Sequence, residues 1–235
     1  FMIAAIGCAI VTLLTWIYVK DTDVEKSIGE RSGFIYGLKQ AFHTKPLPTI
    51  FLLGTVVQFA LVGTNAFLSI YVQEFPLGAH DATFYITLAT AVTGLASVFG
   101  APFVGRYSDQ IGAEKMVALC LIVMGGTLIL QSFAQTFVLF LIFRFLFGLA
   151  VGGVTPSFNT LISKYSPYDM ESRFFSYNNS FFNFGMLLGP TVGGWISTAF
   201  STRGLFSICS VLLLCCFVWV KLFILNRKEQ FKPQI

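Results

Sequence analysis

Seven stretches of about 20 mostly apolar residues divide this chain of 235 residues, and the charged residues lie almost entirely between them. The stretches cover roughly residues 1–19, 49–72, 83–104, 117–134, 138–162, 174–199 and 205–225. A helix needs about 20 apolar residues to cross roughly 30 Å of hydrocarbon. Because the runs are continuous and do not alternate, they favour helices over barrel strands. The sequence therefore predicts an all-α polytopic membrane protein.

The composition excludes several classes of protein. Only 11% of the residues are charged, against roughly 25% in a soluble domain, so too few are present to cover a wetted surface. Soluble globular, disordered and nucleic-acid-binding proteins are excluded on this ground. The five cysteines lie inside apolar runs, without the spacing of a metal site or a disulfide framework. A membrane-embedded enzyme would need clustered His, Asp, Glu, Ser or Cys at one depth, and the sequence shows no such cluster.

The basic residues predict the orientation. Lys and Arg fall in alternate connections: twelve lie in residues 20–48, after the third span, after the fifth span and in the tail. The opposite connections hold only Arg203, beside Glu74 and Asp81. Basic residues are enriched on the cytoplasmic side, so we expect a cytoplasmic C-terminus and a first residue on the outer side. The chain begins inside an apolar run, which we interpret as a cut through a longer protein.

Three motifs punctuate the spans. The connection after the third span reads Gly105-Arg106-Tyr107-Ser108-Asp109-Gln110-Ile111-Gly112-Ala113-Glu114-Lys115. Gly105 and Gly112 are expected to permit a tight turn at the helix ends, and Asp109 to accept N–H groups or pair with a cation. The fifth span holds Arg144, Gly148, Gly152, Gly153 and Pro156, and the sixth holds Gly185, Gly189, Pro190, Gly193 and Gly194.

These motifs resemble those of the major facilitator superfamily. The first is similar to the family's cytoplasmic Gly-x-x-x-Asp-x-x-Gly signature, although Glu114 stands where a basic residue is common. The second resembles the arginine-and-glycine helix 4 and its repeat, helix 10. The third is similar to the antiporter motif in helix 5 of drug–proton exporters, whose repeat counterpart is helix 11; Ser176 stands where the longer motif has a further glycine.

The resemblance implies a domain organisation with seven of the family's twelve helices. Residues 1–19 correspond to helix 6, 20–48 to the central cytoplasmic loop, 49–226 to the C-terminal six-helix bundle, and 227–235 to a cytoplasmic tail. The expected partners are the lipid bilayer, a small-molecule substrate and the missing N-terminal six-helix half. No nucleic acid is expected.

Polar residues inside the spans are candidates for a substrate cavity. Gln58 and Asn65 share one face of the second span, Arg144 lies in the fifth, and Asn179 and Asn183 accompany Phe182 in the sixth. Cavity lining and hydrogen bonding across helix contacts both explain the amides, and headgroup or carbonyl contact is the alternative for Arg144.

The loop and glycine motifs are given separate roles. The expected latch that closes the cytoplasmic side comprises Gly105, Arg106, Asp109 and Gly112. Helix packing or bending is expected of Gly185, Gly189, Pro190, Gly193 and Gly194.

The function that the resemblance implies is proton-coupled efflux of drugs or other small amphipathic molecules by alternating access, in the cell membrane and with a role in antibiotic resistance. No cofactor or metal is expected, and a proton gradient is the driving force. Because no acidic residue lies inside a span, we expect the proton carriers in helices 1–5. An importer or exporter of a sugar or other metabolite, and a transport-inactive sensor or scaffold, remain alternatives.

Overall fold

The computed structural model describes residues 7–9, 11–15, 34–44, 46–76, 82–167 and 170–225, and all its regular elements there are helices. The chain divides into two units, Phe1–Ser32 and Gly33–Ile235. Within the first unit, residues 7–9 and 11–15 are helical, and most of the first predicted span lies outside the described residues. The helices of the second unit are α2 (Phe34–His43), α3 (Leu47–Ala66), α4 (Leu68–Gln73), α5 (Ala82–Ile111), α6 (Ala113–Ser132), α7 (Phe137–Tyr165), α8 (Glu171–Val220) and the π-helical turn η2 (Lys221–Leu225).

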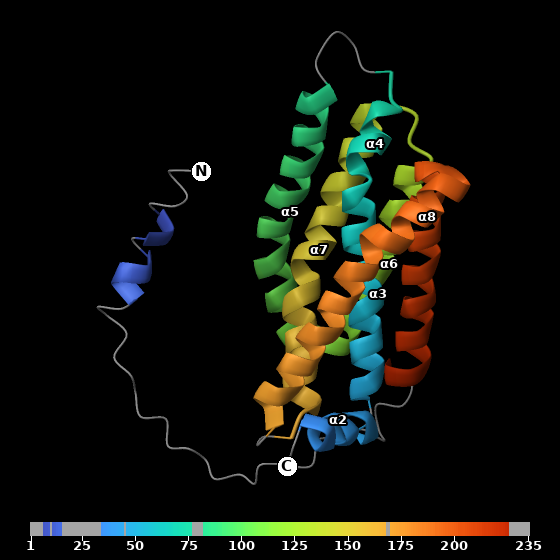
Figure 1. The fold of residues 1–235 in the computed structure, drawn as a ribbon. Helices are drawn as coiled ribbons and strands as arrows, with labels where there is room; N and C mark the ends of the chain where they lie inside the picture. Colours follow the sequence, from blue (N-terminus) through green and yellow to red (C-terminus); the bar gives the residue numbers. More distant parts are fainter. Residues whose placement is uncertain are drawn as a thin grey trace. The chain divides into compact units, whose positions relative to one another are not determined.

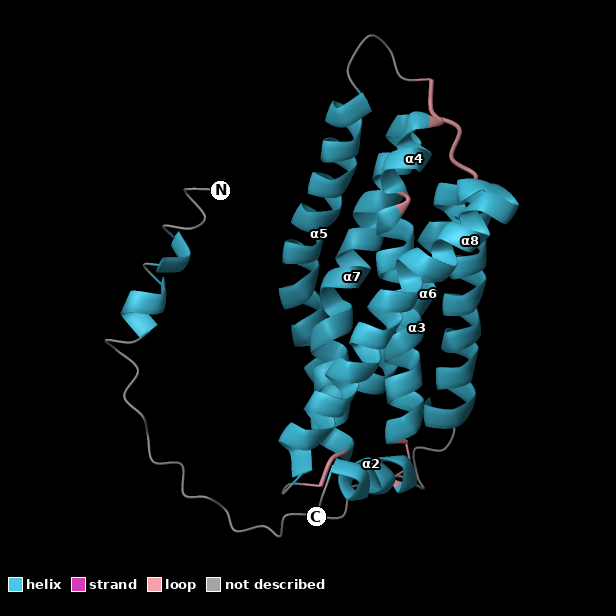
Figure 2. Ribbon diagram, viewed as in Figure 1, coloured by secondary structure: helices cyan, strands magenta, loops and turns pink. Residues whose placement is uncertain are grey.

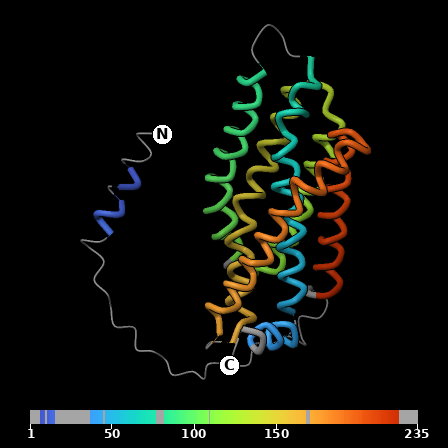
Figure 3. The backbone as a smooth tube through the Cα atoms, viewed as in Figure 1, coloured from blue at the N-terminus to red at the C-terminus, as the bar shows by residue number. Residues whose placement is uncertain are grey.

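Five helices of the described part are long and apolar enough to cross a membrane, and they overlap each of the last six predicted spans; the predicted span 49–72 is divided at Phe67 between α3 and α4. There are five such helices for six predicted spans because α8 holds two of the spans. Its backbone leaves helical geometry at Ser201 (φ 67°, ψ 168°), and the chain reverses there (Figure 1). The limbs before and after Ser201 run in opposite directions, orange and red in Figure 3. The first limb matches the predicted span 174–199 and the second the span 205–225.

The second unit is a bundle of near-parallel helices with α2 lying across one end (Figure 2). We refer to this end as the α2 end and to the other as the far end. The principal contacts join α3 to the first limb of α8, α5 to α7, and α6 to both α7 and α8. The core is aliphatic and aromatic, as expected for helices that pack in lipid by shape.

The prediction for Gly105 is wrong. The sequence predicted a helix end near residue 104 followed by a loop, whereas α5 continues to Ile111 and carries Gly105 in its interior. A glycine costs a helix only about 1 kcal/mol, so it permits a turn without imposing one. Only Gly112 makes the turn, with φ 97° and ψ 139°, a left-handed conformation that suits glycine. It is the single residue between α5 and α6.

Candidate functional site

A buried polar cluster surrounds Arg144 in α7. The Arg144 side chain is 0% exposed, and it donates hydrogen bonds to the Asn65 Oδ1 of α3 and, at 3.5 Å, to the Gln131 Oε1 of α6. Its guanidinium also lies 5.2 Å from the ring centroid of Phe147, one turn along the same helix. The cluster therefore joins three helices that are far apart in the sequence.

The charge of this cluster is unbalanced within the described residues. The two acceptors of Arg144 are neutral amides, and its Nε and the Gln131 Nε2 have no partner there. A buried cation is costly unless dipoles or charges compensate it, and here the two amide oxygens supply the dipoles. Asn65 is exposed, whereas Arg144 is not. The exposed polar group is thus the Asn65 amide, and the buried Arg144 orients it through a hydrogen bond.

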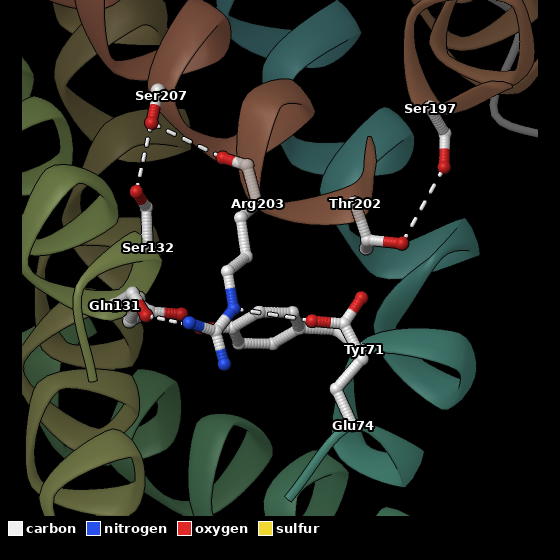
Figure 4. Close-up of polar contacts among 8 residues, drawn as sticks. All are labelled: Tyr71, Glu74, Gln131, Ser132, Ser197, Thr202, Arg203 and Ser207. Carbon is white, nitrogen blue, oxygen red and sulfur yellow. Dashed lines mark hydrogen bonds and ion pairs between the residues drawn. The ribbon is translucent and has the colours of Figure 1, made fainter. Parts of the chain in front are cut away.

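A second polar network lies at the far end of the bundle (Figure 4). The Tyr71 hydroxyl donates to the Gln131 backbone carbonyl at 2.5 Å, and the Arg203 Nε pairs with the Glu74 Oε2 at 3.1 Å. The Arg203 guanidinium also lies 6.0 Å from the Tyr71 ring centroid. Sequence reasoning missed this network. Its signal was the placement of Arg203 and Glu74, which are opposite charges in the connections that hold few others.

The remaining cavity candidates occupy different environments. Asn179 and Asn183 are exposed on the first limb of α8, and Gln58 is half-buried beside Gly185, where α3 and α8 touch. Phe182 is buried: its ring packs edge-on against Phe158 of α7 at a centroid distance of 5.6 Å. The structure therefore brings Asn65 and Arg144 together, and it places Phe182 in the packing between helices.

The α2 end carries the signature motif. Arg106 is exposed, and the Asp109 side chain lies outside the described part of the structure. The Glu114 side chain is fully buried in the first turn of α6, where its Oε1 accepts from Lys164 Nζ at 2.5 Å and from the Tyr165 hydroxyl at 2.8 Å. Carboxylates are favoured at helix N-termini, and Lys164 supplies the opposite charge. Sequence reasoning noted the unusual Glu114 but not this partner from the end of α7.

The glycine motif lies where α8 meets α3. A Cβ atom on Gly185 would collide with the Thr55 carbonyl oxygen, and one on Gly189 would lie 2.8 Å from the Gly63 backbone nitrogen. Both helices approach closely because these positions lack side chains. Pro190 is exposed, and within the described backbone α8 departs from helical geometry at Ser201.

With this geometry in view, the comparisons with known proteins identify the family. The sequence profile of the Major Facilitator Superfamily matches residues 77–234, which is more than half of the chain. The chain belongs to the Major Facilitator Superfamily.

Relatives in this superfamily include the multidrug resistance protein MdtG of Salmonella paratyphi B and that of Salmonella newport. Each is 29% identical over 214 residues, covering 91% of this chain and 53% of the relative. The chain thus spans about half the length of the curated relatives it matches.

Solved superfamily structures share the fold. The E. coli fucose:proton symporter FucP matches with a TM-score of 0.68 at 16% identity, over 91% of this chain and 52% of that one. The inward-open E. coli xylose transporter XylE matches with a TM-score of 0.60 at 15% identity, over 84% and 53%. The chain is therefore a multi-pass membrane protein of a transporter family, helical in all the regular elements of its described part, and that family does not consist of enzymes.

Proposed function

We propose that this chain corresponds to the C-terminal half of a proton-coupled exporter of drugs or other small amphipathic molecules. The observation that carries the proposal is its 29% identity, over 91% of its length, to a protein named for multidrug resistance. In this assignment residues 1–19 are helix 6, 20–48 the central loop and 49–226 helices 7–12, with 227–235 as a tail. The partner is an N-terminal six-helix half that carries the proton-binding acids.

The proposed mechanism is alternating access, in which two six-helix bundles rock around a central cavity. Gln58, Asn65, Asn179 and Asn183 contribute amides to one wall of this cavity. Arg144 acts through Asn65, because the guanidinium is buried and fixes the amide that is exposed. The Phe182 ring packs between Gly54 of α3 and Phe158 of α7, and so sets the spacing of the helices behind this wall. A proton gradient drives the cycle, and no cofactor takes part.

The proposed orientation follows the basic residues. The α2 end, the end of α5 that carries Asp109 and the C-terminus face the cytoplasm, in the plasma membrane, and export through this orientation would confer antibiotic resistance. The latch residues Gly105, Arg106, Asp109 and Gly112 then close the cytoplasmic side when the cavity opens outward. Support comes from the backbone conformation of Gly112, which joins α5 and α6 in one tight turn.

A sugar or metabolite carrier is the second candidate. The likeness to FucP and XylE favours it, but at 15–16% identity this likeness concerns the fold alone. A transport-inactive sensor is the candidate from another class. A carrier and a sensor would both have the same helical bundle as an exporter, so a transport assay is needed to distinguish the three.

The test uses the full-length protein that carries this sequence, reconstituted in vesicles with an imposed proton gradient. We expect movement of a fluorescent amphipathic dye that stops when a protonophore collapses the gradient, and no movement of radiolabelled xylose or fucose. Sugar movement without dye movement would instead identify a metabolite carrier. Movement of neither would favour the sensor, provided that dye is transported by reconstituted MdtG in a parallel preparation.

A further inference from the structure

An apolar groove of about 550 Å³ lies between α5, α6 and α7, toward the α2 end of the bundle. Its walls include Phe103, Tyr107 and Ile111 from α5, Leu119 from α6 and Leu149 from α7. The groove arises because α5 packs closely on α7 but meets α6 sparsely beyond their one-residue connection. Figure 1 shows α5, in green, lying along α7.

The groove is open on the side away from the core. Phe103 is 63% exposed, Tyr107 52% and Leu119 51%, although all three belong to helices that are long and apolar enough to cross a membrane. Large apolar patches of this kind indicate an apolar occupant. For a concave surface on membrane-crossing helices, a lipid acyl chain has the matching chemistry.

The length of the groove fits one leaflet. From Gly100 to Ile111 the α5 wall extends over eleven residue steps, which corresponds to about 16 Å at the rise of an α-helix. The hydrocarbon core of a bilayer is roughly 30 Å thick, so the groove covers about half of it. An acyl chain that enters from the α2 end would end near Gly100.

Two exposed basic residues are next in the sequence to residues that line the groove near the α2 end. Arg106 precedes the lining residue Tyr107, and Lys115 precedes the lining residue Met116; both basic side chains are exposed. Basic side chains at the ends of membrane helices reach the headgroup layer and attract anionic lipids, which are enriched on the cytoplasmic side. This end of the groove therefore complements a negatively charged headgroup.

We propose that this groove binds one acyl chain of an anionic glycerophospholipid from the cytoplasmic leaflet, with Lys115 holding the phosphate. The inference uses the orientation given under the proposed function, but not the substrate or the direction of transport. Occupancy by lipid would also fill the space between α5 and α6, and so stabilise the corner at Gly112.

The test places the full-length protein in nanodiscs with phosphatidylglycerol that carries a photoactivatable group in one acyl chain. After illumination, we expect labelled peptides from residues 100–123, and weaker labelling by the matching phosphatidylcholine probe. Leu119→Trp should fill the groove and remove the label. Ile122→Trp is the matched control, because Ile122 is 40% exposed on the same helix but does not line the groove.

The headgroup contact has its own variant. Lys115→Gln should lower phosphatidylglycerol labelling roughly fivefold, since one basic residue contributes about 1 kcal/mol to anionic-lipid binding. Lys39→Gln, which removes an exposed basic residue of α2, should leave it unchanged.

Three outcomes would overturn the lipid site: labelling spread evenly over the membrane helices, equal labelling by both lipids, or cross-links from Leu119 to another protein segment in place of lipid. The mapped label on the unaltered protein decides the matter even if a variant folds poorly. Dye transport is measured separately, so failure of the exporter proposal is distinguishable from failure of the lipid site.

Discussion

Ser201 is a single residue on which the path of the chain depends. It joins the two limbs of α8 with φ 67° and ψ 168°, a region of backbone conformation that is essentially reserved for glycine. A side chain in this conformation costs on the order of 1–3 kcal/mol. The strain persists because the limbs on either side are held by packing against α3 and α6.

Ser201→Gly should therefore raise the melting temperature of the purified protein, because glycine adopts this conformation without the steric penalty. The gain is expected to be about 1 kcal/mol, since glycine also loses more backbone entropy on folding. The measurement is thermal unfolding in detergent followed by tryptophan fluorescence. Ser180→Gly, at an exposed helical position of α8, is the control and should lower the melting temperature. An equal decrease for both variants would contradict the strain.

Arg144 and Asn65 form the second feature at the residue scale. If Arg144 acts only by orienting Asn65, then Asn65→Ala and Arg144→Gln should each reduce dye transport, and the double variant should be no worse than the stronger single one. Initial transport rates in vesicles of equal protein content measure this. Additive losses would show that the guanidinium has a separate role.

At the scale of elements, the close contact between α3 and α8 depends on glycines. Gly185 touches the backbone of α3, whereas a Cβ on Gly126 of α6 would meet nothing within 4 Å. Gly185→Ala should destabilise the protein by about 1–3 kcal/mol, because a backbone atom must move to admit the methyl group. Gly126→Ala should be neutral or stabilising by up to about 1 kcal/mol, through its helix propensity. Thermal unfolding of the pair tests the close approach, and equal effects would refute it.

The Glu114–Lys164 pair joins α6 to α7, and its two members are not equivalent. The Glu114 side chain is fully buried, whereas 36% of the Lys164 side chain is exposed. Lys164→Met should cost about 3 kcal/mol because it leaves a buried carboxylate without its cation. Glu114→Gln should cost only about 1 kcal/mol, since the amide still accepts from Tyr165 and Lys164 can turn to water. Melting temperatures that fall in the opposite order would contradict this account.

The sequence predicts a feature well when the lipid environment alone requires it, and poorly when it depends on packing between helices. The span 138–162 was predicted within a few residues of α7, because lipid demands a continuous apolar helix whatever its neighbours are. The continuation of α5 through Gly105 was not predicted, since local flexibility does not decide whether a helix ends. The Glu114–Lys164 pair was also missed. Its partners are 50 residues apart, and only the packing of α6 on α7 brings them together.

At the scale of the whole molecule, the proposed latch at the corner between α5 and α6 would connect this bundle to the transport cycle. The role of Asp109 as a latch remains a proposal, and Asp109→Asn in the full-length protein tests it. We expect a decrease in dye transport of about tenfold or more, because the loss of one charge-assisted contact of roughly 1.5–3 kcal/mol shifts the closed state by that factor. Membrane insertion, followed by accessibility of a tagged C-terminus, should not change. Transport equal to that of the unaltered protein would refute the latch.

Two ion pairs of the described residues lie at opposite ends of the bundle: Glu114 with Lys164 at the α2 end, and Glu74 with Arg203 at the far end. The first joins α6 to α7, and the second joins the end of α4 to the second limb of α8. We therefore expect the bundle to move as one rigid body during transport. Spin labels placed on α6 and α7, which the Glu114–Lys164 pair joins, should therefore report one unchanging distance throughout the cycle. All of the change should fall on distances that reach beyond this bundle.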